Sequence, residues 1–591
     1  MPEFTHSDFF RTICGIPSSL RMIYKVDKKY ISGLIVLTLI NGVIPVISLL
    51  ISQELINTII SGGQLSYIIS VYVVIQICSA VVTQLNSYLG EKIGFLLSYN
   101  LSTRLMERVA MLKLPDFEQS TVYNLVEKLN QGVSYKPLQL LNAILSLLSS
   151  TVSLFLSLYY IGSWRLEFAL LLLIIPILSL VLFIKVGQME FLLQWKRADK
   201  ERKVWYLNYL LTHDFLFKEI KLNGISDYLI NEYKQLKEQF ILQDLSISRK
   251  KISFNLLLGG VLNIIGLVGI VFMVLLIRQG KLLLGNMVSL IQAFGRVDTY
   301  SQDIIHNIYI INNSNLYMEQ LLMFLDDSSQ SDKQCNSVSK VDISEVEFRD
   351  VSYIYNGNNT PAVKSINLKL LKNELVAIIG KNGSGKSTLV KLLAGLYIPS
   401  KGVILYDNLD FKDNETFFQN NISALFQDFV KYELSLKENI CLGDLSKMDI
   451  EESINLISHD FNIDFIKRGG RIDLDTQLGS WFNNGRQLSG GQWQKIALLR
   501  TFFKEAPIVI LDEPSSALDP ISEKQLFDTF KKNAKDKISI FISHNIKSAQ
   551  KADKIVVLDN GEIVGVGTHV ELLHKCPEYQ EIYYSEEYGN V

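Results

Sequence analysis

The run Leu375–Gly380, LVAIIG, leads into Lys381-Asn382-Gly383-Ser384-Gly385-Lys386-Ser387 and then into the helix-like stretch TLVKLLAGLY, which begins at Thr388. Gly380 to Ser387 match the pattern GxxxxGK[ST] in the order strand, loop and helix that a phosphate-binding loop requires. Glycines allow backbone N–H groups to surround a phosphate, and the N-terminus of the helix adds a favourable dipole. We therefore expect Gly380 to Thr388 to bind ATP, with Lys386 reaching the β and γ phosphates and Ser387 coordinating Mg²⁺.

A second strand-like run, IVIL, starts at Ile508 and ends in Asp512 and Glu513. Open α/β sheets bind their ligands beyond the carboxyl ends of the strands. Asp512 is the expected partner of Mg²⁺, and Glu513 is the candidate general base that polarises a water against the γ phosphate. Acidic residues can also merely cap a strand, but their position downstream of a phosphate loop favours the catalytic interpretation.

The motif LSGGQ, Leu488 to Gln492, precedes the amphipathic run WQKIALLRTFF. It predicts a second helix N-terminus whose small residues Ser489, Gly490 and Gly491, followed by Gln492, allow an anion to approach. One ATP does not need two such cradles.

Around these motifs, short β-rich runs alternate with helical stretches from Val341 onward, which predicts an α/β domain with a largely parallel sheet. A polar segment after Leu325 reads as a linker. The predicted organisation is an N-terminal cytoplasmic segment at 1–29, a transmembrane domain of six helices with long cytoplasmic extensions at 30–325, a linker at 326–340 and an ATP-binding domain at 341–591.

The 591 residues exceed the size of a single core, and the mixture of 48% hydrophobic with 20% charged residues is typical of an apolar part fused to a soluble part. A net charge of -2 provides no basic footprint for nucleic acid. The five cysteines show no CxxC spacing, so neither a zinc site nor a disulfide framework is indicated.

The N-terminal half contains six stretches of about the length that crosses a bilayer. They are Tyr30 to Ser52, Tyr67 to Leu89, Leu138 to Ile161, Leu166 to Gly187, Ser253 to Ile277 and Leu282 to Asn307. Lys and Arg are dense before the first stretch, between the second and third, and between the fourth and fifth, which places these segments and both termini in the cytoplasm. The sixth stretch carries Arg296, Asp298 and Asp303, so it is a cytoplasmic helical extension, a helix with a structural ion pair, or a helix that lines a substrate path.

Taken together, the motifs resemble the ATP-binding cassette (ABC) family, whose LSGGQ signature caps the ATP held by the opposite copy. The resemblance implies that Tyr355 stacks on adenine, with Tyr353 as a neighbouring candidate. It also implies that Gln427 in LFQDF senses Mg²⁺ and the membrane half, and that His544 in FISHN is the switch histidine. Ser516 to Asp519 resemble the D-loop of the family.

Six spans followed by one cassette resemble a half-transporter of the exporter type, which implies a homodimer. The turns at Leu114 to Tyr123 and Leu210 to Gly224 resemble coupling helices that carry motion between the cassettes and the spans. One departure is LGSWFNNGRQLSGGQ, in which Ser480, Trp481 and Phe482 stand where many exporters have a Glu-containing stretch. The coupling contact is therefore expected to differ.

That stretch, with FQDFVKYELS, LTHDFLFKEIKLNGIS and the terminal YYSEEY, resembles lantibiotic exporters of the nisin and subtilin type. The resemblance implies ATP-driven export of a modified precursor peptide across the plasma membrane of a Gram-positive bacterium, among membrane lipids and alongside a dehydratase and a cyclase. Two alternatives remain open at the level of sequence. One is an exporter of lipids or hydrophobic drugs, and the other is a membrane-anchored ATPase that acts mechanically without transport.

Overall fold

The computed structural model describes residues 6–326, 340–412, 414–448, 461, 463–468, 471–514 and 520–588. The chain divides into two compact units. The first consists of Met1–Leu112 and Ser120–Ser329, and the second consists of Lys113–Gln119 and Gln330–Val591. The short segment Lys113–Gln119, which lies inside the predicted transmembrane domain in sequence, thus belongs by its contacts to the ATP-binding unit.

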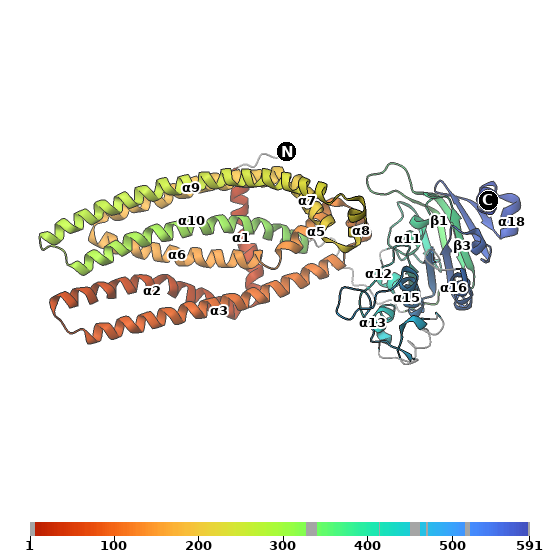
Figure 1. Ribbon diagram of the computed structural model, residues 1–591, viewed down its shortest axis with the longest axis horizontal. Helices are drawn as coiled ribbons and strands as arrows, with labels where there is room; N and C mark the ends of the chain where they lie inside the picture. The colour runs from red at the N-terminus through yellow and green to blue at the C-terminus, as the bar shows by residue number, and fades with distance from the viewer. Residues whose placement is uncertain are drawn as a thin grey trace. The chain divides into compact units, whose positions relative to one another are not determined.

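The first unit is a bundle of long helices that run side by side (Figure 1). Its helices are α1 His6–Val26, α2 Lys28–Ser61, α3 Ser66–Ala110, α5 Ser120–Gly132, α6 Lys136–Trp164, α7 Leu166–Thr212, α8 Asp214–Asn223, α9 Ser226–Arg278 and α10 Leu284–Asp326. Helix α9 has 53 residues and α7 has 47, more than twice the roughly 20 that cross the hydrocarbon core. These two helices are thus much longer than a single crossing requires.

Within the described residues, four helices are long and apolar enough to cross a membrane, namely α2, α3, α6 and α9. Helix α7 contains the fourth predicted span and α10 contains the sixth. Helix α10, whose charged residues weaken its hydropathy, packs against both α6 and α2, and α7 packs against α9. The six long helices thus form one bundle, and a charged sixth helix is accommodated because its neighbours cover it.

Close packing of α2 against α6 depends on a glycine. A Cβ added at Gly42 would lie 2.9 Å from the carbonyl oxygen of Ser149, and Ser153 Oγ donates a 2.6 Å hydrogen bond to the carbonyl of Gly42. The ends of α2 are set locally. Asp27 accepts hydrogen bonds from Lys29 N and Tyr30 N at the start, and Gly62 takes a left-handed φ of 71° at the end.

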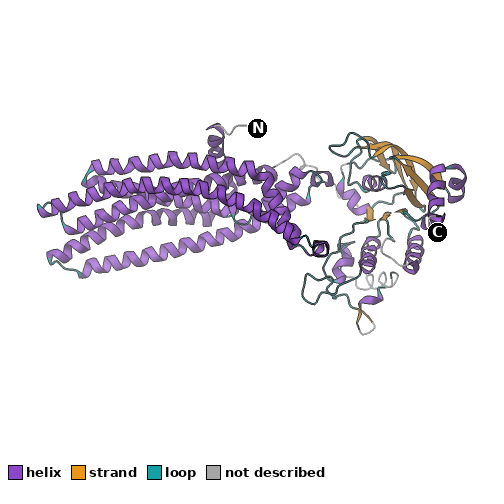
Figure 2. Ribbon diagram, turned by 45° about the horizontal axis from the view of Figure 1, so that its top comes forward, coloured by secondary structure: helices purple, strands orange, loops and turns teal. Residues whose placement is uncertain are grey.

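The second unit is an α/β domain whose described strands form three sheets, the smallest of them the antiparallel pair β6-β7, and the strands drawn in Figure 2 lie in this unit. The larger sheet has the order β11-β10-β3-β9-β8-β5, in which β10, β3, β9, β8 and β5 are parallel. A smaller antiparallel sheet has the order β2-β1-β4. The strands are β1 Glu345–Tyr353, β2 Val363–Leu371, β3 Leu375–Gly380, β4 Lys401–Tyr406, β5 Ile422–Leu425, β6 Lys467–Arg468, β7 Arg471–Ile472, β8 Ile508–Asp512, β9 Ile538–Ile542, β10 Lys554–Asp559 and β11 Glu562–Gly567.

The helices of this unit are α11 Lys386–Leu393, α12 Glu415–Asn421, α13 Leu436–Cys441, α15 Gly490–Phe503, α16 Pro520–Asn533, α17 Ile546–Ala549, α18 His569–Lys575 and α19 Pro577–Tyr588, with α4 Leu114–Phe117 from the earlier segment and short 3-10 turns at Leu445–Lys447 and Asp464–Ile466. One core of this unit lies between the larger sheet and helices that include α15 and α16, and the other lies between the larger sheet, α11 and the smaller antiparallel sheet. Alternate residues of β3 enter two separate apolar cores, with Ala377 in one and Ile378 in the other. The predicted fold class, an all-α transmembrane domain fused to an α/β nucleotide-binding domain, is confirmed.

Candidate functional site

The phosphate loop connects β3 to α11, as its sequence predicted. Gly380 and Gly385 cannot be replaced by larger residues without a clash, because a Cβ at Gly380 would lie 2.2 Å from the carbonyl oxygen of Leu558 and one at Gly385 would lie 2.6 Å from that of Ala362. Gly385 also has a φ of 100°, a value that L side chains rarely adopt. The glycines therefore allow the loop to lie against neighbouring backbone.

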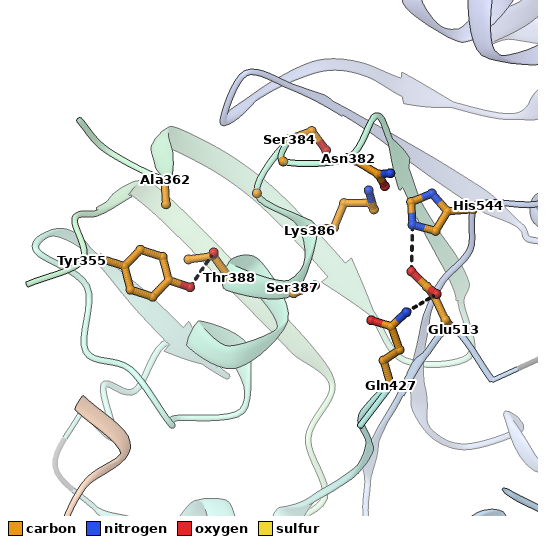
Figure 3. Close-up of a pocket in the computed structure, with 12 residues that line it drawn as sticks. Tyr355, Ala362, Asn382, Ser384, Lys386, Ser387, Thr388, Gln427, Glu513 and His544 are labelled. Carbon is orange, nitrogen blue, oxygen red and sulfur yellow. Dashed lines mark hydrogen bonds and ion pairs between the residues drawn. The ribbon is translucent and has the colours of Figure 1, made fainter. Parts of the chain in front are cut away.

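The loop lines a cavity of about 840 Å³ (Figure 3). Its lining consists of Tyr355, Ala362, Asn382, Gly383, Ser384, Gly385, Lys386, Ser387, Thr388, Gln427, Glu513 and His544. Segments far apart in sequence thus meet at one place. Figure 3 shows Tyr355 on one side of the loop and the pair Glu513 and His544 on the other.

Two polar groups in the loop fit an anionic ligand. Ser384 Oγ is buried and has no hydrogen-bond partner among the described residues. Lys386 Nζ donates to the carbonyl oxygens of Gly380 at 2.8 Å and Lys381 at 3.0 Å. Burial lowers the pKa of Lys386, while the charges of Glu513 and Asp512 act in the opposite direction. A buried hydroxyl and a buried amine with only carbonyl partners provide donors that match phosphate oxygens.

The acidic residues come from β8, and His544 follows β9, the neighbouring parallel strand. Because parallel strands end at the same edge, Glu513 and His544 meet there, with 2.7 Å between Glu513 Oε1 and His544 Nε2. On the other oxygen, Gln427 Nε2 donates a 2.7 Å hydrogen bond to Glu513 Oε2 (Figure 3). Glu513 therefore lies between two donors from two other segments.

Glu513 also has an unusual backbone. Its φ is 49°, in the left-handed region that a non-glycine residue enters only at a cost of order 1–3 kcal/mol. The conformation is held by a hydrogen bond from Glu513 N to the carbonyl of Ile542 at 3.2 Å and by Gln494 Nε2, which donates to the carbonyl of Pro514 at 2.7 Å. With this backbone conformation, the Glu513 side chain lines the cavity.

Asp512, one residue earlier, is only 6% exposed. Burial, followed by the nearby charge of Glu513, raises its pKa to about 6. A buried carboxyl group with another carboxylate beside it is stabilised in its charged form by a cation. The donor set of Asp512, the Ser387 hydroxyl and the Gln427 amide oxygen is the all-oxygen type that suits Mg²⁺.

The structure separates the two candidate aromatic residues. Tyr353 is buried and stacks on Tyr397, with 4.7 Å between ring centroids. Tyr355 lines the cavity, and its hydroxyl lies 3.0 Å from Thr388 Oγ1. Only the ring of Tyr355 is thus in a position to face a ligand in this cavity.

The LSGGQ motif lies elsewhere in the same unit. Ser489 caps α15, because its Oγ accepts from Gln492 N at 3.3 Å while Gln492 Oε1 accepts from Ser489 N at 2.9 Å. Ser489 and Gly490 are exposed, and none of Ser489, Gly490, Gly491 or Gln492 is among the described residues that line the cavity. A single chain therefore presents this helix N-terminus at its surface. The D-loop candidate, Ser516 to Asp519, falls outside the described residues.

Glu433 holds the stretch before the signature in which Ser480, Trp481 and Phe482 replace the Glu-containing sequence of many exporters. Its Oε2 accepts from Ser480 N at 2.5 Å and from Trp481 N at 2.7 Å. This contact holds the turn so that Trp481 and Phe482 are 73% and 55% exposed. Sequence reasoning did not identify Glu433, because a lone glutamate 47 residues upstream gives no local signal.

The segment Lys113–Gln119 contributes a further contact within the ATP-binding unit. Leu114 packs against the apolar core that contains the phosphate-loop strand. Tyr397 Oη donates to Glu118 Oε1. Burial and this carboxylate raise the pKa of Tyr397, so the phenol remains a donor. The first predicted coupling turn is thus joined to the ATP-binding unit through Leu114 and Glu118.

The three charged residues of α10 are not brought together. Arg296 donates to the carbonyl oxygen of Pro45 on α2. Asp298 accepts a 3.0 Å hydrogen bond from Gln302, and the backbone carbonyl of Asp303 accepts one from Asn307. Within the described residues, Arg296 forms no ion pair with either aspartate, so the structural ion pair considered from sequence is not observed.

A family model, two relatives of known name and one solved structure are similar to this chain. Residues 363–516 match a family model described as ABC transporter. The chain is 52% identical to the nisin transport ATP-binding protein NisT of Lactococcus lactis, over 99% of this chain and 98% of that protein, and 43% identical to the subtilin transport ATP-binding protein SpaT of Bacillus subtilis, over 97% and 94%. Its fold matches the structure of a bacterial Atm1-family ABC exporter with ATP bound, with a TM-score of 0.76, 20% identity, and coverage of 95% of this chain and 98% of that chain.

Proposed function

This chain belongs to the ABC transporter family, and from that premise we propose that it exports a post-translationally modified lantibiotic precursor peptide, driven by ATP. The observation that carries the proposal is its similarity to the nisin and subtilin transport proteins, which extends over the membrane helices as well as the ATPase. A similarity confined to the ATPase would leave the cargo open, because ATPase motifs are shared across the family. Here the cargo-facing half is included.

In this proposal, the phosphate loop holds the triphosphate and Lys386 neutralises its charge. Tyr355 stacks on the adenine. Glu513 orients and deprotonates the attacking water, because phosphoryl transfer depends mainly on positioning and charge stabilisation. The short contacts from His544 and Gln427 support a role for these two residues in fixing the direction of the Glu513 carboxylate.

We propose that Ser387, Gln427 and Asp512 hold Mg²⁺. The ion would supply positive charge at the β and γ phosphate oxygens. The raised pKa of Asp512 supports the assignment, since a cation beside this carboxyl group would favour its ionised form.

The working unit is proposed to be a homodimer with two equivalent ATP sites. Each site would combine the cavity of one copy with Ser489 to Gln492 of the other. Exposure of the signature at the helix N-terminus, apart from the cavity of its own chain, supports this arrangement. ATP would then favour the closed dimer by binding it more tightly than the open one, and hydrolysis would release it.

Motion would reach the membrane through the turns at Leu114 to Tyr123 and Leu210 to Gly224. Contacts of Leu114 and Glu118 inside the ATP-binding unit support the first turn. For the second, Arg197 on α7 binds Asp244 on α9 at 2.7 Å, and Lys203 binds Glu232 at 2.6 Å. These ion pairs hold α7 and α9, the two helices that flank α8, together. The two helices would therefore move as one rigid body.

The protein is a membrane protein, as its apolar helices and its relatives indicate. We further propose a multi-pass position in the plasma membrane of a Gram-positive bacterium, with both termini in the cytoplasm. We also propose that the protein acts alongside a lantibiotic dehydratase and a cyclase. Arg296, Asp298 and Asp303 are proposed to border the substrate path, because charged side chains inside a bilayer normally face a bundle interior or water.

A secretion experiment tests the cargo. Cells that produce a modified, leader-bearing lantibiotic precursor would carry either this protein or its Glu513→Gln variant. The precursor should appear in the medium only with the intact protein, and antibacterial activity should follow addition of the leader protease. Equal retention in both strains, with a folded protein that hydrolyses ATP, would reject this cargo and favour lipid or drug export.

A further inference from the structure

A cavity of about 490 Å³, lined by both polar and apolar side chains, lies among three helices of the bundle. Helix α2 contributes Thr38 and Asn41, α3 contributes Asn86 and Glu91, and α6 contributes a longer row that includes Asn142. All three helices belong to the same compact unit and pack on one another. The cavity is therefore a feature of the bundle itself.

The lining repeats at helical spacing on each helix. On α6, the lining residues are Leu138, Asn142, Leu145, Ser146 and Ser149. Leu138, Asn142, Leu145 and Ser149 follow one another at intervals of three or four residues, and Ser146 lies next to Leu145. Positions three and four apart share one face of a helix. Three helices thus turn polar faces towards one cavity, although each is apolar enough overall to cross a bilayer.

Such polar faces are costly against lipid, so they are expected to line water or a ligand. Internal hydrogen bonds satisfy some of the groups. Thr38 Oγ1 donates to Asn86 Oδ1 at 3.3 Å, and Asn307 Nδ2 donates to Ser146 Oγ at 2.9 Å. Asn142 and Glu91 are exposed and have no side-chain partner among the described residues. An amide and a carboxylate therefore remain available to a ligand.

Among the described residues of the bundle, no cationic side chain pairs with Glu91. The adjacent Lys92 turns to Tyr30, with its Nζ 3.7 Å from the ring centroid. Arg296, the cation of α10, donates to the carbonyl of Pro45 instead. Glu91 is also the only titratable residue among those that line the described cavity. Glu91 lies just beyond the cytoplasmic end of the predicted span Tyr67 to Leu89. A carboxylate without a partner beside a cavity can pair with a cation that enters the cavity.

We propose that this cavity binds a cationic side chain of the transported peptide, with Glu91 pairing with its ammonium or guanidinium group and Asn142 with a neighbouring peptide amide. The inference rests on the proposed export function and adds a binding site to it. In the proposed topology, the cavity occupies the cytoplasmic half of the bundle. It is thus where a peptide that enters from the cytoplasm would first be held.

The test uses the purified full-length protein in vesicles of phosphatidylcholine and phosphatidylglycerol, which contain no lipid amine. The probes are a lysine-bearing, leader-containing lantibiotic precursor and the same precursor with acetylated lysines, both with a blocked N-terminus. For Glu91→Gln, KM for transport of the unmodified precursor should rise roughly fivefold, the effect of losing about 1 kcal/mol from a partly exposed charge pair.

With the acetylated precursor, the native protein should show the same raised KM, and Glu91→Gln should cause no further change. Glu91→Asp should restore most of the affinity. Glu107→Gln on the same helix, an exposed residue outside the cavity, is the matched control and should leave KM unchanged. An unaltered KM in Glu91→Gln, or an equal rise for both precursors, would overturn the proposal.

A second measurement does not depend on transport. In the variant Asn142→Cys, the thiol at 142 is labelled with a cationic or an anionic methanethiosulfonate, and mass spectrometry reads that position separately from the five native cysteines. The ratio of cationic to anionic rates should fall severalfold on adding Glu91→Gln. If this ratio depends on Glu91 but the protein transports no precursor, the proposed cargo is refuted, and the peptide site is refuted with it. The result would then show only that Glu91 attracts cations locally. A ratio independent of Glu91 would refute the site alone.

Discussion

Glu513 Oε1 lies 2.7 Å from His544 Nε2, although the two residues are 31 positions apart in the chain. The contact arises because β8 and β9 are parallel neighbours that end at the same edge of the sheet. Gln427 holds the second carboxylate oxygen at 2.7 Å. The carboxylate that is proposed to activate water is therefore positioned by groups that follow two other strands, and small shifts of either strand would change its direction.

Replacing Glu513 with glutamine should reduce ATP hydrolysis by about 100-fold or more, since a positioned general base contributes roughly 10²–10⁴-fold. ATP affinity should change little, because the phosphate loop and Tyr355 are untouched. Phosphate release and nucleotide binding measured on the same vesicles check both statements. Glu562→Gln, which removes a surface pair with Lys364, is the matched control and should retain full activity. Hydrolysis near the native rate in Glu513→Gln would assign the base to another residue.

Tyr355→Ala should raise KM for ATP by roughly 5-fold to 100-fold, since stacking of a base on an aromatic ring contributes about 1–3 kcal/mol. Tyr355→Phe keeps the ring and removes only the hydroxyl that faces Thr388. Its KM should stay close to the native value. Titration of hydrolysis rate against ATP distinguishes the two variants, and a normal KM in Tyr355→Ala would leave adenine recognition to residues outside this side of the cavity.

Mixed dimers should reveal a shared site. A dimer that pairs a Lys386→Ala chain with a Gly490→Asp chain keeps one complete site if the signature acts across copies. A dimer that pairs a doubly substituted chain with a native one keeps none. Two affinity tags isolate each mixed dimer before hydrolysis is measured. Activity in the first dimer and not in the second is expected, and the reverse pattern would place each complete site within one chain.

Glu118→Gln should reduce transport and cargo-stimulated hydrolysis by roughly threefold to tenfold, because it weakens a charge-assisted hydrogen bond from Tyr397. Basal hydrolysis should persist, since Glu118 does not line the ATP cavity. Tyr397→Phe should give a similar loss, and the double variant should be no worse than either single one. Additive losses would show that the two residues act independently.

Much of the ATP site could be predicted from sequence, because its parts are local. A phosphate loop needs glycines at fixed spacing between a strand and a helix, and Gly380 to Ser387 satisfy this within eight residues. Asp512 and Glu513 were found because they follow a short buried run. The structure then brought Glu513 to His544 and Gln427, which local sequence could not do without a resemblance to other proteins.

Other features depend on tertiary contacts. Tyr353 and Tyr355 are equivalent in sequence, and only stacking of Tyr353 on Tyr397 separates them. The β-rich runs predicted one largely parallel sheet and did not reveal the separate antiparallel sheet β2-β1-β4, because strand propensity does not determine which strands pair. The cavity at Glu91 was also missed, since its polar residues are spread over three helices and each is unremarkable in its own helix.

Transport into inverted vesicles tests the central claim most directly. Purified protein would be given Mg²⁺, ATP and the lysine-bearing modified precursor outside, and the precursor inside would be measured over time. The account predicts accumulation above the outside concentration that requires hydrolysable ATP and is lost in Glu513→Gln. Steady hydrolysis of ATP by the native protein, with precursor that never exceeds passive entry, would contradict it.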